Sequence, residues 1–235
     1  MTTGRATGLH ALVLADGDRP AGAALDAAWP GWDHDVALVV AADGGARLAA
    51  DLGLAIDRWV GDGDSIPPED LAALEERGVT VRRASPDKDE SDSELAVLEA
   101  MAAGAGRITI LGALGGRRLD HLLANVALLA HPALAGIPAR LLDERSRLSL
   151  VDAPIGGPVQ RRDLAGRVGD LVSLLPWGAG IGRVRTSGLR YPLRDEPLPA
   201  GPARGLSNVR VAPDAWIDVR GGRLLVIESP ATLGP

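Results

Sequence analysis

The chain has 235 residues, of which 46% are hydrophobic and 24% charged, a composition typical of a folded protein with a hydrophobic core. Its formal net charge of −6 argues against a nucleic-acid-binding protein, because such proteins normally carry a basic face. The absence of cysteine excludes disulfide bonds, thiolate zinc sites and cysteine nucleophiles, and no run of about 18–20 apolar residues predicts a membrane span.

The first half of the chain alternates short apolar runs with helical patterns. Strands are predicted within residues 10–16, 36–45, 58–65, 79–85 and 107–116, and helices within 46–53, 67–78, 91–106 and 119–132. Gly53 is predicted to cap the first of these helices at its C-terminus. Strands that alternate with helices predict a parallel sheet with right-handed crossovers, so this part is expected to be an α/β domain.

From about Ile137 the pattern changes to short strands separated by Gly and Pro. Such strands are predicted within residues 139–154, 167–177, 180–193, 212–222 and 223–230, without a helix. The stretch DVRGGRLLVIE, residues 218–228, predicts a β-hairpin. The chain is therefore expected to hold an α/β domain followed by a β-rich domain, joined around residues 140–160.

Acidic residues and glycines cluster where the predicted strands end. Asp43 stands in ADGG, Asp62 and Asp64 stand in GDGDS, and residues 112–121 read GALGGRRLDH. Ligands of parallel sheets bind beyond the carboxyl ends of the strands, where these clusters would gather. Glycines let backbone N–H groups approach an anion, and Mg²⁺ binds carboxylates together with phosphate oxygens. The pattern predicts a site for a metal ion and a phosphate group.

Each cluster also has an ordinary structural interpretation. A lone D-G-D is more often a tight turn than a metal site, and Asp64 or Ser65 would equally cap the helix starting near Pro67. Ser91 and Glu94 fit a capping box. Several polar clusters at successive strand ends together favour the binding-site interpretation.

Three segments in order, AADGGARLAADLGLAIDRWVGDGDSI, DKDESDSELAVLEA and GALGGRRLDHLLANVALL, resemble thiamine pyrophosphokinases. The later GLRYPL, ARGLSNVRV and GGRLLVIE resemble the C-terminal domain of that family, so the resemblance covers about residues 10–230. It implies a Rossmann-like α/β domain at residues 9–140 that binds nucleotide and metal. It also implies a smaller all-β sandwich at residues 141–235 that binds thiamine.

The resemblance further implies the reaction and its partners. The family transfers a diphosphate group from ATP to the hydroxyl of thiamine, with Mg²⁺, and gives thiamine diphosphate and AMP. Its members are homodimers with the active site at the interface, and neither nucleic acid nor a membrane takes part. The opening MTTGRATG lacks the apolar run of a secretory signal, so a cytoplasmic protein is expected.

The family's functional residues map onto this sequence motif by motif. The implied metal ligands are Asp43, Asp62, Asp64, Asp89 and Asp92. The implied nucleotide-binding residues are Asp43, Gly44, Gly45, Lys88, Asp89, Gly115, Gly116, Arg117, His121 and Asn125. The implied thiamine-binding residues are Tyr191, Ser207 and Asn208, and the implied catalytic residues are Asp62, Asp64, Asp92, Arg118 and Asp120.

Departures from the family pattern leave some roles open. Gly63 replaces a bulkier residue in GDGDS, which predicts a looser loop. The GGRRLDH motif is one residue longer than usual, so Arg117 and Arg118 compete for one role, with Arg118 favoured by its spacing to Asp120. Asp120 is expected either to orient the thiamine hydroxyl or to act as its base. The alternative functions are a diphosphokinase for another alcohol, such as a hydroxymethylpterin, and a non-catalytic sensor that binds nucleotide or thiamine.

Overall fold

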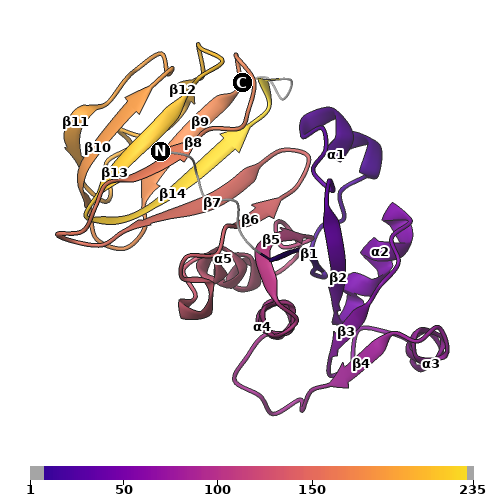
Figure 1. The fold of residues 1–235 in the computed structure, drawn as a ribbon. Coiled ribbons are helices and arrows are strands. Elements are labelled where there is room, and N and C mark those ends of the chain that lie inside the picture. Colours follow the sequence, from indigo (N-terminus) through magenta and orange to yellow (C-terminus); the bar gives the residue numbers. More distant parts are fainter. Residues whose placement is uncertain (1–7, 232–235) are drawn as a thin grey trace. The chain divides into compact units, whose positions relative to one another are not determined.

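The computed structural model of the chain describes residues 8–231 (Figure 1). It divides into two compact units, with the boundary between Glu144 and Arg145. Each unit has its own strands and its own hydrophobic core, so each is described by itself.

The first unit contains a parallel sheet, as predicted. Its strands are β1 (Leu9–Leu14), β2 (Val36–Ala42), β3 (Arg58–Gly61), β4 (Thr80–Arg83), β5 (Ala105–Leu111) and β6 (Ala139–Leu142). They lie in the order β6-β5-β1-β2-β3-β4, and every neighbouring pair is parallel. The chain thus moves outward from β1 to β4 and then crosses back to β5. The order reverses between β1 and β5, where parallel sheets open a crevice for ligands.

Helices cover both faces of this sheet, with α2 and α3 on one face and α4 and α5 on the other (Figure 1). The helical segments are α1 (Gly22–Ala28), η1 (Asp43–Gly45), α2 (Ala46–Leu52), α3 (Pro68–Glu76), α4 (Asp92–Ala102), α5 (Leu119–Leu128) and η2 (Pro132–Leu134). Gly53 ends α2 with φ of 65°, the predicted left-handed cap. The helix α1 was not predicted, because GAALDAA offers only one large apolar side chain, Leu25. Among residues 8–231, no helix is both long and apolar enough to cross a membrane.

The core of the first unit is built around the central strand β1. Leu12 and Leu14 of this strand are fully buried and pack with Leu25 of α1 and Leu48 of α2. The strand reads as a continuous apolar run because helices cover it from both sides. This packing fixes the carboxyl ends of the strands, from which the polar loops begin.

The second unit is β-rich, as predicted, and consists of two antiparallel sheets. Its strands are β7 (Arg147–Ala153), β8 (Gln160–Asp163), β9 (Leu171–Pro176), β10 (Ile181–Ser187), β11 (Arg194–Leu198), β12 (Asn208–Val209), β13 (Trp216–Arg220) and β14 (Gly222–Ser229). One sheet has the order β12-β9-β14-β7 and the other β11-β10-β13-β8. Val172 and Leu224 from the first sheet share one core with Val184 and Ile217 from the second. The unit is therefore a sandwich of two sheets.

The predicted hairpin at residues 218–228 is wrong. The strands β13 and β14 do not pair with each other: β13 pairs with β10 and β8, whereas β14 pairs with β7 and β9. Gly221 and Gly222, with φ of 67° and 132°, turn the chain from one sheet to the other. Both strands direct apolar residues into the shared core, which favours this crossover over a two-stranded hairpin.

Candidate active site

The predicted acidic segments lie at the carboxyl ends of three neighbouring strands of the parallel sheet. Asp43 follows β2, Asp62 follows β3, and Lys88 lies in the connection from β4 to Asp92, the first residue of α4. Because parallel strands end at one edge, segments distant in sequence converge there.

One carboxylate oxygen from each of Asp43, Asp62 and Asp92 lies within 4.8 Å of the other two. The Lys88 ammonium lies 3.3 Å from Asp62 Oδ2 and 2.9 Å from Asp92 Oδ1, and only 13% of its side chain is exposed. We call these four residues the acid cluster. An all-oxygen set of this kind suits a hard cation such as Mg²⁺.

Asp43 is the most constrained member of the cluster. It is buried, with φ of 43°, and Trp59 Nε1 donates a hydrogen bond to its carbonyl oxygen at 3.0 Å. Its Oδ2 accepts a hydrogen bond from Ser65 N at 3.1 Å, but its buried Oδ1 has no hydrogen-bond partner among residues 8–231. Burial raises the pKa of Asp43 despite the bond from Ser65, and Asp92 and Asp64 raise it further. A buried, unpartnered carboxylate oxygen in this position fits a metal ligand.

Asp62 and Lys88 hold their charges in the cluster. The hydrogen bond from Asp64 N lowers the pKa of Asp62 against a small burial effect, and Lys88 lowers it further. Burial alone would lower the pKa of Lys88, but the ion pairs with Asp92 and Asp62 outweigh it and raise this pKa. The ammonium therefore stays protonated and partly neutralises the carboxylates.

Gly44 and Gly45 allow the turn after β2 to pack against β1. A Cβ on Gly45 would lie 2.0 Å from the carbonyl oxygen of Leu14, and one on Gly44 would lie 2.3 Å from Asp16 Oδ2. The atoms that these two glycines allow to come close are therefore those of Leu14 and Asp16 in the same chain. These glycines hold Asp43 in place at the edge of the sheet.

Gly63 has a conformational reason to be glycine. Its φ is 84°, in the left-handed region, whereas the atoms nearest to an added Cβ would be 3.9 Å away. Space is thus available, but a bulkier residue would strain this backbone.

Two predicted metal ligands lie outside the group of three carboxylates. Asp64 and Asp89 are exposed, and Asp64 Oδ1 accepts a hydrogen bond from the Ser65 hydroxyl at 2.9 Å. Helix α3 has no side-chain cap, so neither Asp64 nor Ser65 plays that role. Ser91 does cap α4, since its Oγ accepts a hydrogen bond from Glu94 N at 3.2 Å.

The loop after β5 carries the glycine-rich turn. Gly115 and Gly116 have φ of 74° and 83°, and Gly116 N donates to Asp18 Oδ1 at 2.9 Å. Asn125 supports the start of the loop, because its Nδ2 donates to the carbonyl oxygen of Ala113 at 3.0 Å.

The same loop ends at α5 with two exposed arginines, and these differ in their partners. Arg118 donates from Nε and Nη2 to the two oxygens of Asp120, at 3.1 and 2.5 Å. These bonds, helped by the His121 N–H, lower the pKa of Asp120 to about 2. No ion pair involves Arg117 within residues 8–231. His121 is exposed at the first turn of α5.

Sequence reasoning missed the loop after β1. Arg47 of α2 contacts both oxygens of Asp16 at 3.0 Å and donates to the carbonyl oxygen of Ser65 at 2.7 Å. This guanidinium thereby ties the loop after β1 to the loop that carries Asp62. The signal was present, because residues 15–18 read ADGD at the end of a predicted strand.

The predicted thiamine-side residues of the second unit lie together. Asn208 is buried, and its side-chain amide accepts from Tyr191 N at 3.0 Å and donates to Tyr191 O at 2.8 Å. Tyr191 itself is 59% exposed, and the neighbouring Ser207 is exposed with φ of 54°. Asn208 thus holds the backbone that presents the Tyr191 ring.

Comparison with known proteins matches both units. Residues 32–141 match the family model described as "Thiamin pyrophosphokinase, catalytic domain", and residues 160–224 match "Thiamin pyrophosphokinase, vitamin B1 binding domain". The chain is 26% identical over 199 residues to the thiamine pyrophosphokinase of Bacillus subtilis, covering 85% of this chain and 90% of the relative. The crystal structure of the B. subtilis thiamine pyrophosphokinase superposes with a TM-score of 0.78 at 24% identity, covering 94% and 99% of the two chains. That from Geobacillus thermodenitrificans gives 0.75 at 27%, covering 94% and 97%.

Proposed function

The chain belongs to the thiamine pyrophosphokinase family of transferases, and from this membership we propose that it transfers the β,γ-diphosphate of ATP to the hydroxyl of thiamine, with Mg²⁺ as the metal. In this step the bond between the β-phosphorus and the oxygen of the departing AMP breaks, a bond from the thiamine oxygen to that phosphorus forms, and the hydroxyl proton is released. The observation that carries the proposal is the convergence of Asp43, Asp62 and Asp92 at the edge of the sheet. The strand-order reversal beside β1, typical of Rossmann-like nucleotide-binding sheets, adds to it.

The residues present fit a divalent cation. Three carboxylates and one ammonium leave two negative charges when all are ionised, and the buried Asp43 Oδ1 has no partner among the described residues. Asp43, Asp62 and Asp92 would hold Mg²⁺, with Asp64 and Asp89 supplying further oxygens directly or through water. When bound, Mg²⁺ would neutralise charge on phosphate oxygens and polarise the phosphorus.

The surrounding residues would position the nucleotide. Phosphoryl-type transfer needs positioning and charge neutralisation more than covalent chemistry. Lys88, whose ammonium lies among the carboxylates that would hold the metal, would contact phosphate oxygens. Of the two arginines, Arg117 would join it, since Arg118 is paired with Asp120. The loop of Gly115 and Gly116 would offer backbone N–H groups to the same anion, and Gly44, Gly45, His121 and Asn125 would complete the nucleotide site.

Asp120 would orient the hydroxyl of thiamine. Its pKa of about 2, held down by the hydrogen bonds from Arg118, makes it a weak proton acceptor. In that role the Arg118–Asp120 pair positions the thiamine hydroxyl without taking its proton, and this proton passes to solvent or to phosphate.

Tyr191, Ser207 and Asn208 would form the thiamine side. The exposed Tyr191 ring suits stacking on the cationic thiazolium, and Asn208 fixes its backbone. We also propose that residues 9–140 bind nucleotide and metal, that residues 141–235 bind thiamine, and that the protein is a cytoplasmic homodimer with the active site at the subunit interface.

The decisive experiment incubates the protein with ATP, Mg²⁺ and thiamine and identifies the products by ³¹P NMR and chromatography. We expect AMP and thiamine diphosphate in equal amounts, and no product when EDTA removes the metal. ADP as the nucleotide product, or AMP release without thiamine, would overturn the proposal. A hydroxymethylpterin in place of thiamine tests the alternative substrate, and light scattering measures whether the active species is a dimer.

A further inference from the structure

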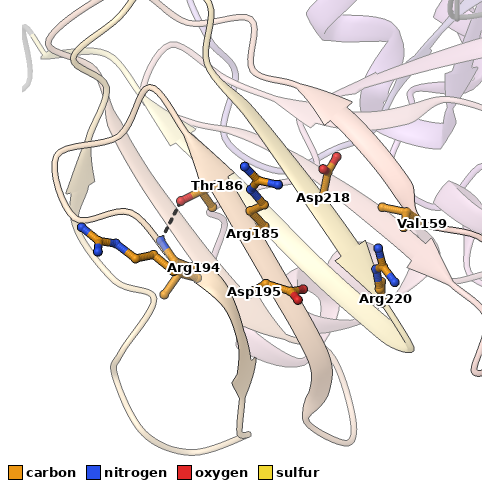
Figure 2. A pocket seen from close by; sticks show the side chains of 8 residues that line it. Val159, Arg185, Thr186, Arg194, Asp195, Asp218 and Arg220 are labelled. Atoms are coloured by element: carbon orange, nitrogen blue, oxygen red, sulfur yellow. Dashed lines mark hydrogen bonds between the residues drawn. The ribbon is translucent and has the colours of Figure 1, made fainter.

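The second unit carries a cavity that none of the roles above uses. It has a volume of about 510 Å³ and opens on the sheet β11-β10-β13-β8 (Figure 2). Its lining residues come from the strands of this sheet and from the segments just before β8 and β11: Val159, Arg185, Thr186, Leu193, Arg194, Asp195, Asp218 and Arg220. We call it the arginine pocket.

The carboxylates of the arginine pocket are already neutralised from outside it. Arg183 Nε lies 2.8 Å from Asp195, and Arg161 binds both oxygens of Asp218 at 2.7 Å. Arg161 and Arg183 do not line the pocket. Its own arginines have no carboxylate partner within residues 8–231: Arg185, Arg194 and Arg220. The pocket therefore concentrates positive charge on a chain whose net charge is −6.

Strand register places like charges opposite each other at two positions of this sheet, and Asp218, the register partner of Arg185 on β13, is held by Arg161. Arg185 of β10 is the register partner of Arg194 on β11, and Arg183 of β10 is the partner of Arg220 on β13. Like charges directly opposite on antiparallel strands destabilise the pair. The stacking of Arg185 over Trp216, 5.7 Å from the ring centroid, leaves the charge of Arg185 in place. An anion bound beside Arg185 or Arg220 would offset this repulsion.

The backbone beside the arginine pocket is also unusual. The pairing of β10 with β11 shifts register on both sides of Val184, and Asp195 of β11 has φ of 63°. Bulges redirect side chains and are frequent next to functional sites, and a left-handed aspartate costs conformational energy. The distortion lies where Asp195 meets Arg183 at the wall of the pocket.

We propose that the arginine pocket binds the diphosphate group of a small phosphorylated molecule. Arginine forks match the oxygens of phosphate groups in pairs, and several unpaired guanidiniums suit a multiply charged anion better than a carboxylate. The volume is in the range of small-molecule sites. This is a second site, made from none of the residues assigned to diphosphate transfer.

The test titrates metal-free protein with inorganic diphosphate in EDTA, followed by calorimetry. Without metal, the acid cluster repels this anion, so binding there does not contribute. We expect saturable binding with one diphosphate per chain, weakened at least about tenfold in Arg185→Gln/Arg194→Gln. The control Arg77→Gln/Arg83→Gln removes the same charge from exposed positions of the first unit and should bind as the wild type does. Circular dichroism verifies that both variants are folded.

Each other outcome overturns the proposal. No saturable binding, equal weakening by the control pair, or undiminished binding in the pocket variant would each show that the pocket is not a diphosphate site. A changed oligomeric state of the pocket variant, with unchanged diphosphate binding, would assign this face to contact between copies. Parallel titrations with inorganic phosphate, ADP and thiamine diphosphate identify the source of the diphosphate group. Because no metal is present, the result does not depend on diphosphate transfer, which Arg185→Gln/Arg194→Gln should retain.

Discussion

The acid cluster and the arginine pocket both gather like charges, but they do so in different surroundings. The acids come from loops after separate parallel strands, are partly buried, and already hold the ammonium of Lys88 among them. The arginines stand on the exposed face of an antiparallel sheet, and their neighbouring acids are paired elsewhere. The first arrangement suits a small, hard cation that binds carboxylate oxygens and keeps part of its water, whereas the second suits a larger, multiply charged anion.

The difference shows how burial decides what a charge cluster costs. A buried carboxylate oxygen without a partner, such as Asp43 Oδ1, lowers stability unless a cation binds it. Exposed arginines are partly screened by water and salt, so their repulsion costs less folding free energy than a buried, unpartnered charge does. The acid cluster should therefore be sensitive to single substitutions, and the sheet face should be tolerant of them.

The strongest test of this contrast is Asp62→Asn. We expect turnover to fall by about 10³-fold, because the variant loses a metal ligand and several kcal/mol of transition-state stabilisation. Mg²⁺ should raise the melting temperature of the wild type and not of the variant. Asp70→Asn, an exposed acid in the first turn of α3, serves as the control and should behave as wild type in both measurements. Near-wild-type AMP release by Asp62→Asn would refute the metal assignment.

The acid cluster should also depend on close backbone packing, which Gly45→Ala tests. The added Cβ would lie 2.0 Å from Leu14 O, so the turn holding Asp43 must move away from β1. We expect a loss of about 3 kcal/mol in the free energy of unfolding, measured by urea denaturation.

Gly53→Ala is the matched control for the glycine test. Gly53 has φ of 65° but no atom within 4 Å of an added Cβ. Backbone strain alone should cost about 1 kcal/mol there. Equal losses in the two variants would show that steric packing under Asp43 is unimportant.

The acid cluster was predictable from sequence, and the arginine pocket was not. Asp43 and Asp62 each end an apolar run, and the geometry of parallel sheets brings such ends together without knowledge of side-chain packing. Arg185 and Arg194 become neighbours only through an antiparallel register with a bulge, which periodicity does not specify. The bonds from Arg47 to Asp16 and Ser65 likewise depend on tertiary structure.

The fold, like the two charge clusters, was predictable from sequence in one part and not in another. Alternating strands and helices predicted the parallel sheet of the first unit, because each crossover needs a helix between its strands. The hairpin at residues 218–228 was mispredicted, since a glycine pair between two apolar strands fits either a tight turn or a crossover between sheets. Which one forms depends on the core that both strands enter.

His10 lies outside both charge clusters and should control how the stability of the fold changes at low pH. Burial, together with the charges of Arg107 and Arg140, lowers the pKa of His10 to about 4. In the neutral ring Nδ1–H donates to His34 O, and Nε2 accepts from Thr109, whose Oγ1 already accepts from Arg140. Protonation would put two donors and a second cation against that hydroxyl.

The folded pKa of His10 lies below its unfolded value of 6.5, so its contribution is complete above pH 6.5 and is lost as the pH falls toward 4. We expect a loss of up to about 3 kcal/mol across this window, measured by urea denaturation at each pH. His10→Gln should flatten this slope, whereas His121→Gln, at an exposed position, should preserve it. An unchanged slope in His10→Gln would contradict the assignment.

The smallest expected effect concerns Asn208, whose side-chain oxygen and nitrogen both have partners, unlike Asp43 Oδ1 in the acid cluster. Its Oδ1 accepts from Tyr191 N and from Val209 N at 2.9 Å, and its Nδ2 donates to Tyr191 O. Asn208→Ala leaves these backbone groups without partners and should cost about 1–2 kcal/mol of stability. Because the Tyr191 ring loses its support, the KM for thiamine should rise more than kcat falls.

Ser207→Ala is the control for this prediction, because it changes a neighbouring residue on the thiamine side without removing a side-chain hydrogen bond. The Ser207 side chain makes no hydrogen bond within the described residues, since only its backbone N–H donates, to Ser173 Oγ. The variant should therefore keep its stability within about 0.5 kcal/mol, as surface substitutions usually do. If Asn208→Ala raised the KM for thiamine with no loss of stability, Asn208 would act on the substrate itself. A loss of stability with an unchanged KM would instead separate the clamp on Tyr191 from thiamine binding altogether.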